Sequence, residues 1–213
     1  MVHLTDQEKE KILIAVREAE RHTNGELVTV ICQRSDEYLY IPTLFAALLA
    51  FLVGGVTVML LPGLSGGWNF IVQVLVFVTL ALVFRWPPLT LWLVPKSVKY
   101  HRASLHAHAL FSMKRLHLGD RNGIMLFVSV AERYVEVIAD PELIELVDES
   151  QWRSIVDTFT SHVKKHQILE GYLSAIETAG ELLSIHCSAK RNADSGQHDN
   201  SNRNFLPDHL IEL

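Results

Sequence analysis

Residues 38–84 read YLYIPTLFAALLAFLVGGVTVMLLPGLSGGWNFIVQVLVFVTLALVF and contain no Asp, Glu, Lys or Arg. At about 1.5 Å per residue, a helix over 41–61 reaches about 30 Å, which is the thickness of the hydrocarbon core of a bilayer. The segment 62–67 (PGLSGG) has the composition of a turn. The stretch therefore predicts a two-helix transmembrane hairpin with spans at about 41–61 and 68–88.

Two tryptophans, Trp68 and Trp86, lie at the ends of the second span, where interfacial anchors are found. The alternative is a helical pair buried inside a soluble protein, but the rest of the chain is short for covering two helices that are apolar all round. No ionisable residue lies at mid-depth in either span, so the hairpin indicates an anchor, or a surface for partner helices, rather than a pore.

Positive charges predict the orientation of the hairpin. Its connecting turn has none, whereas its flanks carry Arg34, Arg85, Lys96, Lys99 and Arg102. The positive-inside rule places such flanks in the cytoplasm. Residues 1–26 have no apolar signal-peptide core, so the internal segment must insert the chain. We expect a two-span protein of the cell inner (plasma) membrane with cytoplasmic N- and C-termini.

The polar segments show alternating helix and strand patterns. A capping box, Thr5-x-x-Glu8, predicts the start of the first helix. Runs of β-branched and apolar residues predict strands, and three-to-four-residue apolar spacing predicts helices. The expected strands are 26–33, 124–130 and 134–139, the last two as an antiparallel hairpin, and the expected helices are 6–22, 97–117, 141–147, 151–165 and 170–186.

Strands that are apolar on both faces need helices on both sides of their sheet. The predicted fold class is therefore α/β: a three-layer α/β/α sandwich with a small mixed sheet, interrupted by the transmembrane hairpin. We expect residues 1–37 and 96–187 to form one domain and residues 38–95 to form the hairpin. Residues 188–213 have the composition of a disordered tail, in which the apolar residues near the end form either a frayed terminus or a short docking motif.

Three stretches resemble the TPM domain, a small α/β/α family. They are Glu18–Val30 (EAERHTNGELVTV), Asp120–Asp140 (DRNGIMLFVSVAERYVEVIAD) and Glu149–Gly180 (ESQWRSIVDTFTSHVKKHQILEGYLSAIETAG). The chain is most similar to a bacterial subgroup that carries a two-span hairpin between the first strand and the second helix. The resemblance implies the sandwich fold. Members of the family include acid phosphatases, proteins that bind divalent cations, and assembly or repair factors for membrane complexes, so the resemblance points to roles of these kinds. The family's Gly-x-Gly stretch after the third strand is replaced here by Ala139-Asp140-Pro141-Glu142.

Composition excludes some function classes. The net charge is −5 and no segment is strongly basic, so we expect no nucleic-acid partner. The two cysteines, Cys32 and Cys187, form no metal or redox motif and are expected to be reduced thiols. No P-loop, GxGxxG or Gly-x-Ser-x-Gly motif is present, so the sequence assigns no catalytic or cofactor-binding residue.

Two groups of residues are candidate metal ligands. Asp140, Asp148 and Glu149 follow the third strand and would suit Ca²⁺ or Mg²⁺, which prefer oxygen ligands. Asp140 before Pro141 also fits a helix N-cap, the other explanation of this acidic group. His162 and His166 are four apart on one helical face and would suit a transition metal, unless that face is simply solvated.

These patterns favour a membrane-anchored TPM-like module that has no enzymatic activity and no required cofactor. Its expected partners are the lipid bilayer and a membrane protein complex, which the anchor would bring to a high local concentration. The alternative is a divalent-metal-dependent phosphatase of the TPM type, in which the carboxylates near Asp140 gather the cation.

Overall fold

The computed structural model describes residues 4–21, 23, 25–63, 65–118, 122–165, 167–187 and 210–212. The chain divides into two compact units. Residues 1–35 and 103–213 form an α/β unit, and residues 36–102 form a helical unit that is inserted into it along the chain.

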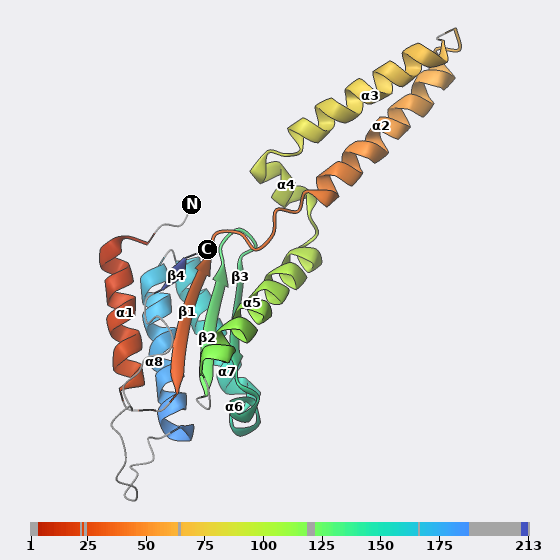
Figure 1. The fold of residues 1–213 in the computed structure, drawn as a ribbon. Coiled ribbons are helices and arrows are strands. Elements are labelled where there is room, and N and C mark those ends of the chain that lie inside the picture. Colours follow the sequence, from red (N-terminus) through yellow and green to blue (C-terminus); the bar gives the residue numbers. More distant parts are fainter. Residues whose placement is uncertain are drawn as a thin grey trace, which may run out of the picture. The chain divides into compact units, whose positions relative to one another are not determined.

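A four-stranded sheet lies at the centre of the α/β unit (Figure 1). Its strands are β1 (Glu26–Cys32), β2 (Gly123–Ser129), β3 (Tyr134–Ala139) and β4 (Ile211–Glu212), in the spatial order β3-β2-β1-β4. β1 pairs in parallel with β2 and β4, whereas β2 and β3 are antiparallel. The predicted mixed sheet and its β2–β3 hairpin are thus confirmed. β1 and β2 are neighbours in the sheet, although the helical unit is inserted between them in the sequence.

Helices cover both faces of this sheet, as Figure 1 shows. Leu27 and Ile31 of β1 point into one core, beneath α1, α7 and α8, while Val28 and Val30 point into a second core, beneath α5. This alternation confirms the three-layer α/β/α sandwich. The capping box at Thr5 and Glu8 is also present. The helices of this unit are α1 (Asp6–Glu20), α5 (Lys96–Leu118, in this unit from Ala103), α6 (Pro141–Leu146), α7 (Glu149–Lys164) and α8 (Ile168–His186).

Thr23 and Gly25 join α1, β1 and the end of α8. The Thr23 hydroxyl donates towards the carbonyl oxygens of Leu183 (3.2 Å) and Cys187 (3.0 Å) and accepts from the Gly25 N–H (3.0 Å). A Cβ at Gly25 would lie 2.5 Å from Leu183 Cδ2. A larger residue here would have to displace the buried Leu183 side chain, which gives the Thr-x-Gly-Glu part of the sequence a physical explanation.

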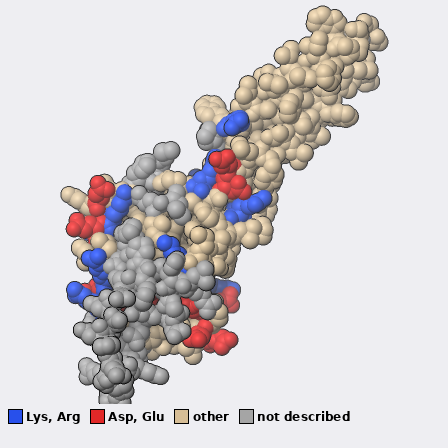
Figure 2. All heavy atoms as spheres, viewed as in Figure 1, with Lys and Arg blue, Asp and Glu red and all other residues tan. Residues whose placement is uncertain are grey.

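The helical unit contains α2 (Tyr40–Leu60), α3 (Gly66–Val83) and α4 (Pro87–Leu93). α2 and α3 have mean hydropathies of 2.3 and 1.9 over their most apolar 18-residue windows, and only 17% and 0% of those windows are buried. Both helices are therefore long and apolar enough to cross a membrane. Their surface carries no acidic or basic side chain in Figure 2. Little of either helix is buried within the structure, in contrast to the core helices of a soluble protein.

The two long helices pack through small residues and polar side chains. Ala46, Ala50 and Gly54 are buried along α2. The Thr57 hydroxyl of α2 donates to the side-chain oxygen of Asn69 on α3. Small residues allow the close helix approach that membrane interiors favour, and a hydrogen bond between helices satisfies polar groups there.

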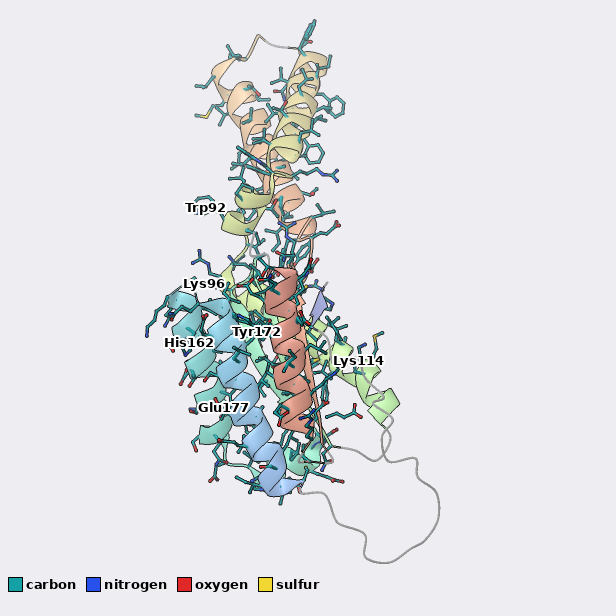
Figure 3. All side chains as sticks on the ribbon, turned by 90° about the vertical axis from the view of Figure 1, so that its left-hand side faces the viewer. Trp92, Lys96, Lys114, His162, Tyr172 and Glu177 are labelled. Atoms are coloured by element: carbon teal, nitrogen blue, oxygen red, sulfur yellow. The ribbon has the colours of Figure 1, made fainter. Side chains whose placement is uncertain are left out.

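The second span is shorter than the sequence predicted. We expected it to extend to about residue 88, but α3 ends at Val83 and a separate helix, α4, starts at Pro87. Pro87 and Pro88 have no N–H to continue the hydrogen bonds of α3, and a proline suits the first turn of a new helix. Trp92 of α4 is 81% exposed and projects outward (Figure 3).

The prediction of a disordered tail over 188–213 is wrong near its end, while residues 188–209 and 213 lie outside the described residues. Ile211 and Glu212 form β4, which pairs with Val30 and Ile31 of β1, and Leu210 is buried in the core. Two residues are too few to show the alternating pattern that predicts a strand. β4 forms because the edge of β1 offers backbone N–H and C=O groups with which residues 211 and 212 can pair.

Candidate functional site

Polar side chains gather where β1 and β2 end, next to each other. Binding sites of α/β proteins are often found at such carboxyl ends of parallel strands. The Ser129 hydroxyl donates to Glu132 Oε2, and the Ser35 N–H donates to Glu132 Oε1 (3.2 Å). The Ser35 and Ser129 hydroxyl oxygens lie 2.7 Å apart. Ser129 is 0% exposed and Glu132 only 3% exposed, whereas Ser35 is half-buried at the edge of the cluster.

This cluster stabilises the strand ends rather than offering a reactive group. Glu132 belongs to the four-residue turn between β2 and β3, in which Arg133 adopts a positive φ of 54°. Its carboxylate accepts hydrogen bonds from the chain that follows β1 and from the end of β2, and so it ties three segments together. Sequence reasoning missed Glu132, although an acidic residue in a short turn directly after an apolar strand was a signal.

A thiol and an imidazole lie close together beneath α5. Cys32 Sγ is 4.0 Å from His106 Nδ1 and donates to the carbonyl oxygen of Arg34 (2.9 Å). The His106 ring packs edge-on against Phe127, with centroids 5.9 Å apart. Burial raises the pKa of the Cys32 thiol above its usual range. A protonated, buried thiol is a poor nucleophile, so this pair indicates core packing.

We expect Cys32 to be alkylated far more slowly in the folded protein than in urea. We also expect the free energy of unfolding of the α/β unit to fall as pH rises above about 8.5, the usual thiol pKa. The unfolded chain loses the thiol proton first, so the stabilisation is complete below the unfolded pKa and is lost as pH rises towards the higher folded pKa. Urea unfolding at about pH 7 and about pH 9.5, for wild type and Cys32→Ala, measures this. An unchanged pH dependence in Cys32→Ala would contradict it.

Asp140 is buried and engaged within the fold. It is the N-cap residue of α6, as its position before Pro141 suggested, but its side chain makes no capping hydrogen bond. Instead Asp140 Oδ2 accepts from the Gly123 N–H (2.7 Å), and the Asp140 N–H donates to the Gly123 carbonyl oxygen (3.1 Å). A tertiary contact that joins the start of β2 to the end of β3 has replaced the local cap.

The other two carboxylates of this group lie on the surface. Asp148 and Glu149 are exposed at the start of α7, and Glu149 pairs with Arg153 at 2.6 Å. In the part of the chain that the structure describes, no three His, Cys, Asp or Glu side chains come together as ligands of one metal ion. The carboxylates as placed do not fit a Ca²⁺ or Mg²⁺ site.

Of the two predicted histidine ligands, the structure describes His162 but not His166. His162 lies on α7 (Figure 3) and is half-buried, and its Nδ1 has no hydrogen-bond partner among the described residues. His166 lies outside the described residues. The predicted pairing of these two side chains on a metal therefore stays a prediction.

A groove of about 300 Å³ lies on the surface of the α/β unit between β3 and α7. Its apolar walls are Val135 and Val137 of β3 and Trp152 and Val156 of α7. All four side chains are partly exposed, and each lies at the border of the core rather than within it. An apolar groove on the surface of a domain is typical of a binding site.

Beside this groove, β3 forms an edge of the sheet. Among the described strands it has β2 as its one neighbour. The Asp140 N–H donates to Gly123 across this ladder. Because bonding alternates along an antiparallel pair, Tyr134, Glu136 and Ile138 face β2, whereas the N–H and C=O groups of Val135 and Val137 face the open edge. An edge of this kind can accept a further strand.

The groove carries one unbalanced negative charge. Glu149 and Arg153 line it and pair with each other, and Asp157 lies beside them. Glu136 also belongs to its lining, but its carboxylate contacts Ser104 and His108 of α5 on the other face of the sheet. Asp157 is exposed and has no ion pair among the described side chains. A segment with a basic side chain next to apolar ones would complement this surface.

Comparison with known proteins supports the fold. The family model described as the TPM domain matches residues 92–182, which include α5, α6, α7 and most of α8 but not α1 or β1. The chain is also similar to the NMR structure of BA42 protein from the psychrophilic bacterium Bizionia argentinensis. That likeness has a TM-score of 0.56 and 15% identity, and it covers 99% of this chain and 96% of that chain. At this identity it shows the fold alone. None of the curated proteins compared with the chain matches it.

Proposed function

Since the chain carries a domain of the TPM family, we propose that this domain is a non-enzymatic binding module. The apolar hairpin holds it at the inner face of the cell membrane, and there it binds an extended segment of a membrane-bound protein. The observation that carries the proposal is the open edge of β3 beside the apolar groove of Val135, Val137, Trp152 and Val156.

The groove suits strand addition. A bound segment would pair its backbone with the outward-facing N–H and C=O groups of Val135 and Val137, and place alternate side chains between β3 and α7. Main-chain hydrogen bonds supply affinity in this mode, and side-chain pockets supply selectivity. Asp157 at the rim favours a segment with a basic residue at that position.

The hairpin supplies local concentration. α2 and α3 are long and apolar enough to span a bilayer, and a partner confined to the same membrane meets the groove at a raised effective concentration. Basic residues flank the hairpin, and its turn has none, which favours a cytoplasmic location for the α/β unit. A modest groove can then bind a membrane-bound partner that it would rarely meet in solution.

Site-specific photo-crosslinking tests the proposal in cells that produce the full chain. A photoreactive amino acid at Val156, in the groove, should give a discrete protein adduct. The same amino acid at Ile14 should give none, although Ile14 is 59% exposed on α1. Asp157→Lys should lower the Val156 adduct by about fivefold, because a reversed charge at an interface rim costs on the order of 1 kcal/mol, and Asp157→Asn should lower it less. Equal adducts from Ile14, or a yield that Asp157→Lys leaves unchanged, would overturn the proposal.

A further inference from the structure

The helical unit contains a second groove, which lies between its two long helices. Its volume is about 270 Å³. Leu39, at the start of α2, and Phe77, Val78 and Leu82, near the end of α3, form its apolar walls. Leu39 is 42% exposed and Leu82 is 66% exposed, so the groove opens outward rather than into a core.

One charged side chain, Arg85, lines this groove. The other polar residue in its wall, Thr43, already donates its hydroxyl hydrogen to the Leu39 carbonyl oxygen (2.7 Å). Arg85 follows α3 and is exposed, and among the described residues it has no carboxylate partner. Its guanidinium is therefore the group in the groove that can bind an anion, and a guanidinium matches the geometry of a phosphate.

The remaining basic residues of the unit are placed differently. Arg102 pairs with Asp36 (3.3 Å) and lies over the Tyr40 ring, and Lys99 donates to the carbonyl oxygen of Leu91 (3.0 Å). Lys96 is exposed and does not line the groove. Arg85 is thus distinguished from three neighbouring cations by its position at an apolar groove, and Lys96 offers a control of the same charge.

We propose that this groove binds an anionic phospholipid, with one acyl chain along the apolar wall and the phosphate at Arg85. In a bilayer, an apolar groove between two spans is filled by lipid tails, because the hydrocarbon core contains no water to occupy it. A cation at the cytoplasmic end of the spans then selects the headgroup, since the cytoplasmic leaflet is rich in anionic lipids. The inference rests on the proposed membrane location of the hairpin and is independent of the partner groove on β3 and α7.

Native mass spectrometry of the full chain in detergent tests this site. The protein is titrated with phosphatidylglycerol or with phosphatidylethanolamine of the same acyl chains, and the bound fractions are compared. We expect about fivefold tighter binding of the anionic lipid, which is the contribution of one basic residue near a membrane surface. Arg85→Gln should abolish this preference, whereas Lys96→Gln should keep it. Ala81→Phe should weaken the binding of both lipids, because Ala81 also lines the groove.

The possible outcomes are separable. The proposal would be overturned if wild type bound the two lipids equally. It would also be overturned if Arg85→Gln and Lys96→Gln lost the preference equally, because the preference would then reflect diffuse charge attraction and not a site. Retention of both lipids by Ala81→Phe would overturn the acyl-chain part. The proposed membrane location is read separately, from the resistance of the same variants to alkaline extraction of membranes. A protein that inserts but shows no lipid preference would refute this inference alone.

Discussion

Replacing Glu132 by alanine is expected to destabilise the α/β unit by about 3 kcal/mol, a large share of the stability of a small domain. The variant loses a hydrogen bond from the Ser35 N–H and another from the Ser129 hydroxyl; Ser129 is 0% exposed and Ser35 is half-buried. Each hydrogen bond to a charged group contributes about 1.5–3 kcal/mol, and a buried donor left without an acceptor carries its own desolvation cost. Loosening of this cluster would release the β2–β3 turn and the chain that follows β1.

Pulsed alkylation of Cys32 in increasing urea measures this effect within the full chain. Cys32 is 1% exposed in β1, so its labelling reports unfolding of the α/β unit and not of the hairpin. Glu132→Gln keeps one acceptor and should lose less stability. Glu142→Ala removes an exposed glutamate and is the control, with an expected change within about 0.5 kcal/mol. Equal labelling midpoints for Glu132→Ala and Glu142→Ala would show that the cluster does not stabilise the fold.

The second large effect concerns the hairpin. Leu75→Arg places a charge midway along α3, where Leu75 is 61% exposed. Moving from leucine to arginine at the centre of a span shifts the insertion free energy by about 3 kcal/mol, or about a hundredfold in the insertion equilibrium. We therefore expect α3 to leave the hydrocarbon core in this variant, and a larger share of the chain than in wild type to leave the membrane on alkaline extraction, although α2 can still anchor it.

Trp92→Arg is the matched control for this change. It introduces the same charge at an exposed position on α4, beyond the two long helices. Arginine is tolerated near the ends of spans because its side chain reaches the interface. We expect Trp92→Arg to stay with the membrane. If Leu75→Arg also stays there in full, then α3 does not cross the hydrocarbon core.

Much of the fold follows from local sequence signals. The run 26–33 has β-branched and apolar residues on both faces, and it forms β1, buried along its whole length. Thr5 and Glu8 form the predicted cap because their spacing alone satisfies the first turn of α1. These features need only neighbours along the chain, so the sequence is sufficient to predict them.

The features that the sequence did not reveal depend on tertiary contacts. Asp140 looks like a helix cap from its neighbours, but the N–H of Gly123 approaches it across the sheet. Glu132 looks like a solvated turn residue, yet Ser35 and Ser129 approach it from two strand ends. β4 exists because β1 has an open edge, which no pattern within residues 210–212 can show. The groove between β3 and α7 likewise depends on how two elements pack.

The most direct test of the account is the sidedness of the hairpin. In a Cys187→Ser background, in which the remaining Cys32 is 1% exposed, one new cysteine is placed on the surface. It is Gly63→Cys in the turn, where a Cβ meets no atom within 4 Å, or Ile14→Cys on α1. Cells are then treated with a membrane-impermeant maleimide. We predict labelling of Gly63→Cys in intact cells and labelling of Ile14→Cys only after permeabilisation. Labelling of Ile14→Cys in intact cells would place the α/β unit outside the cytoplasm and contradict the proposed location of the binding module.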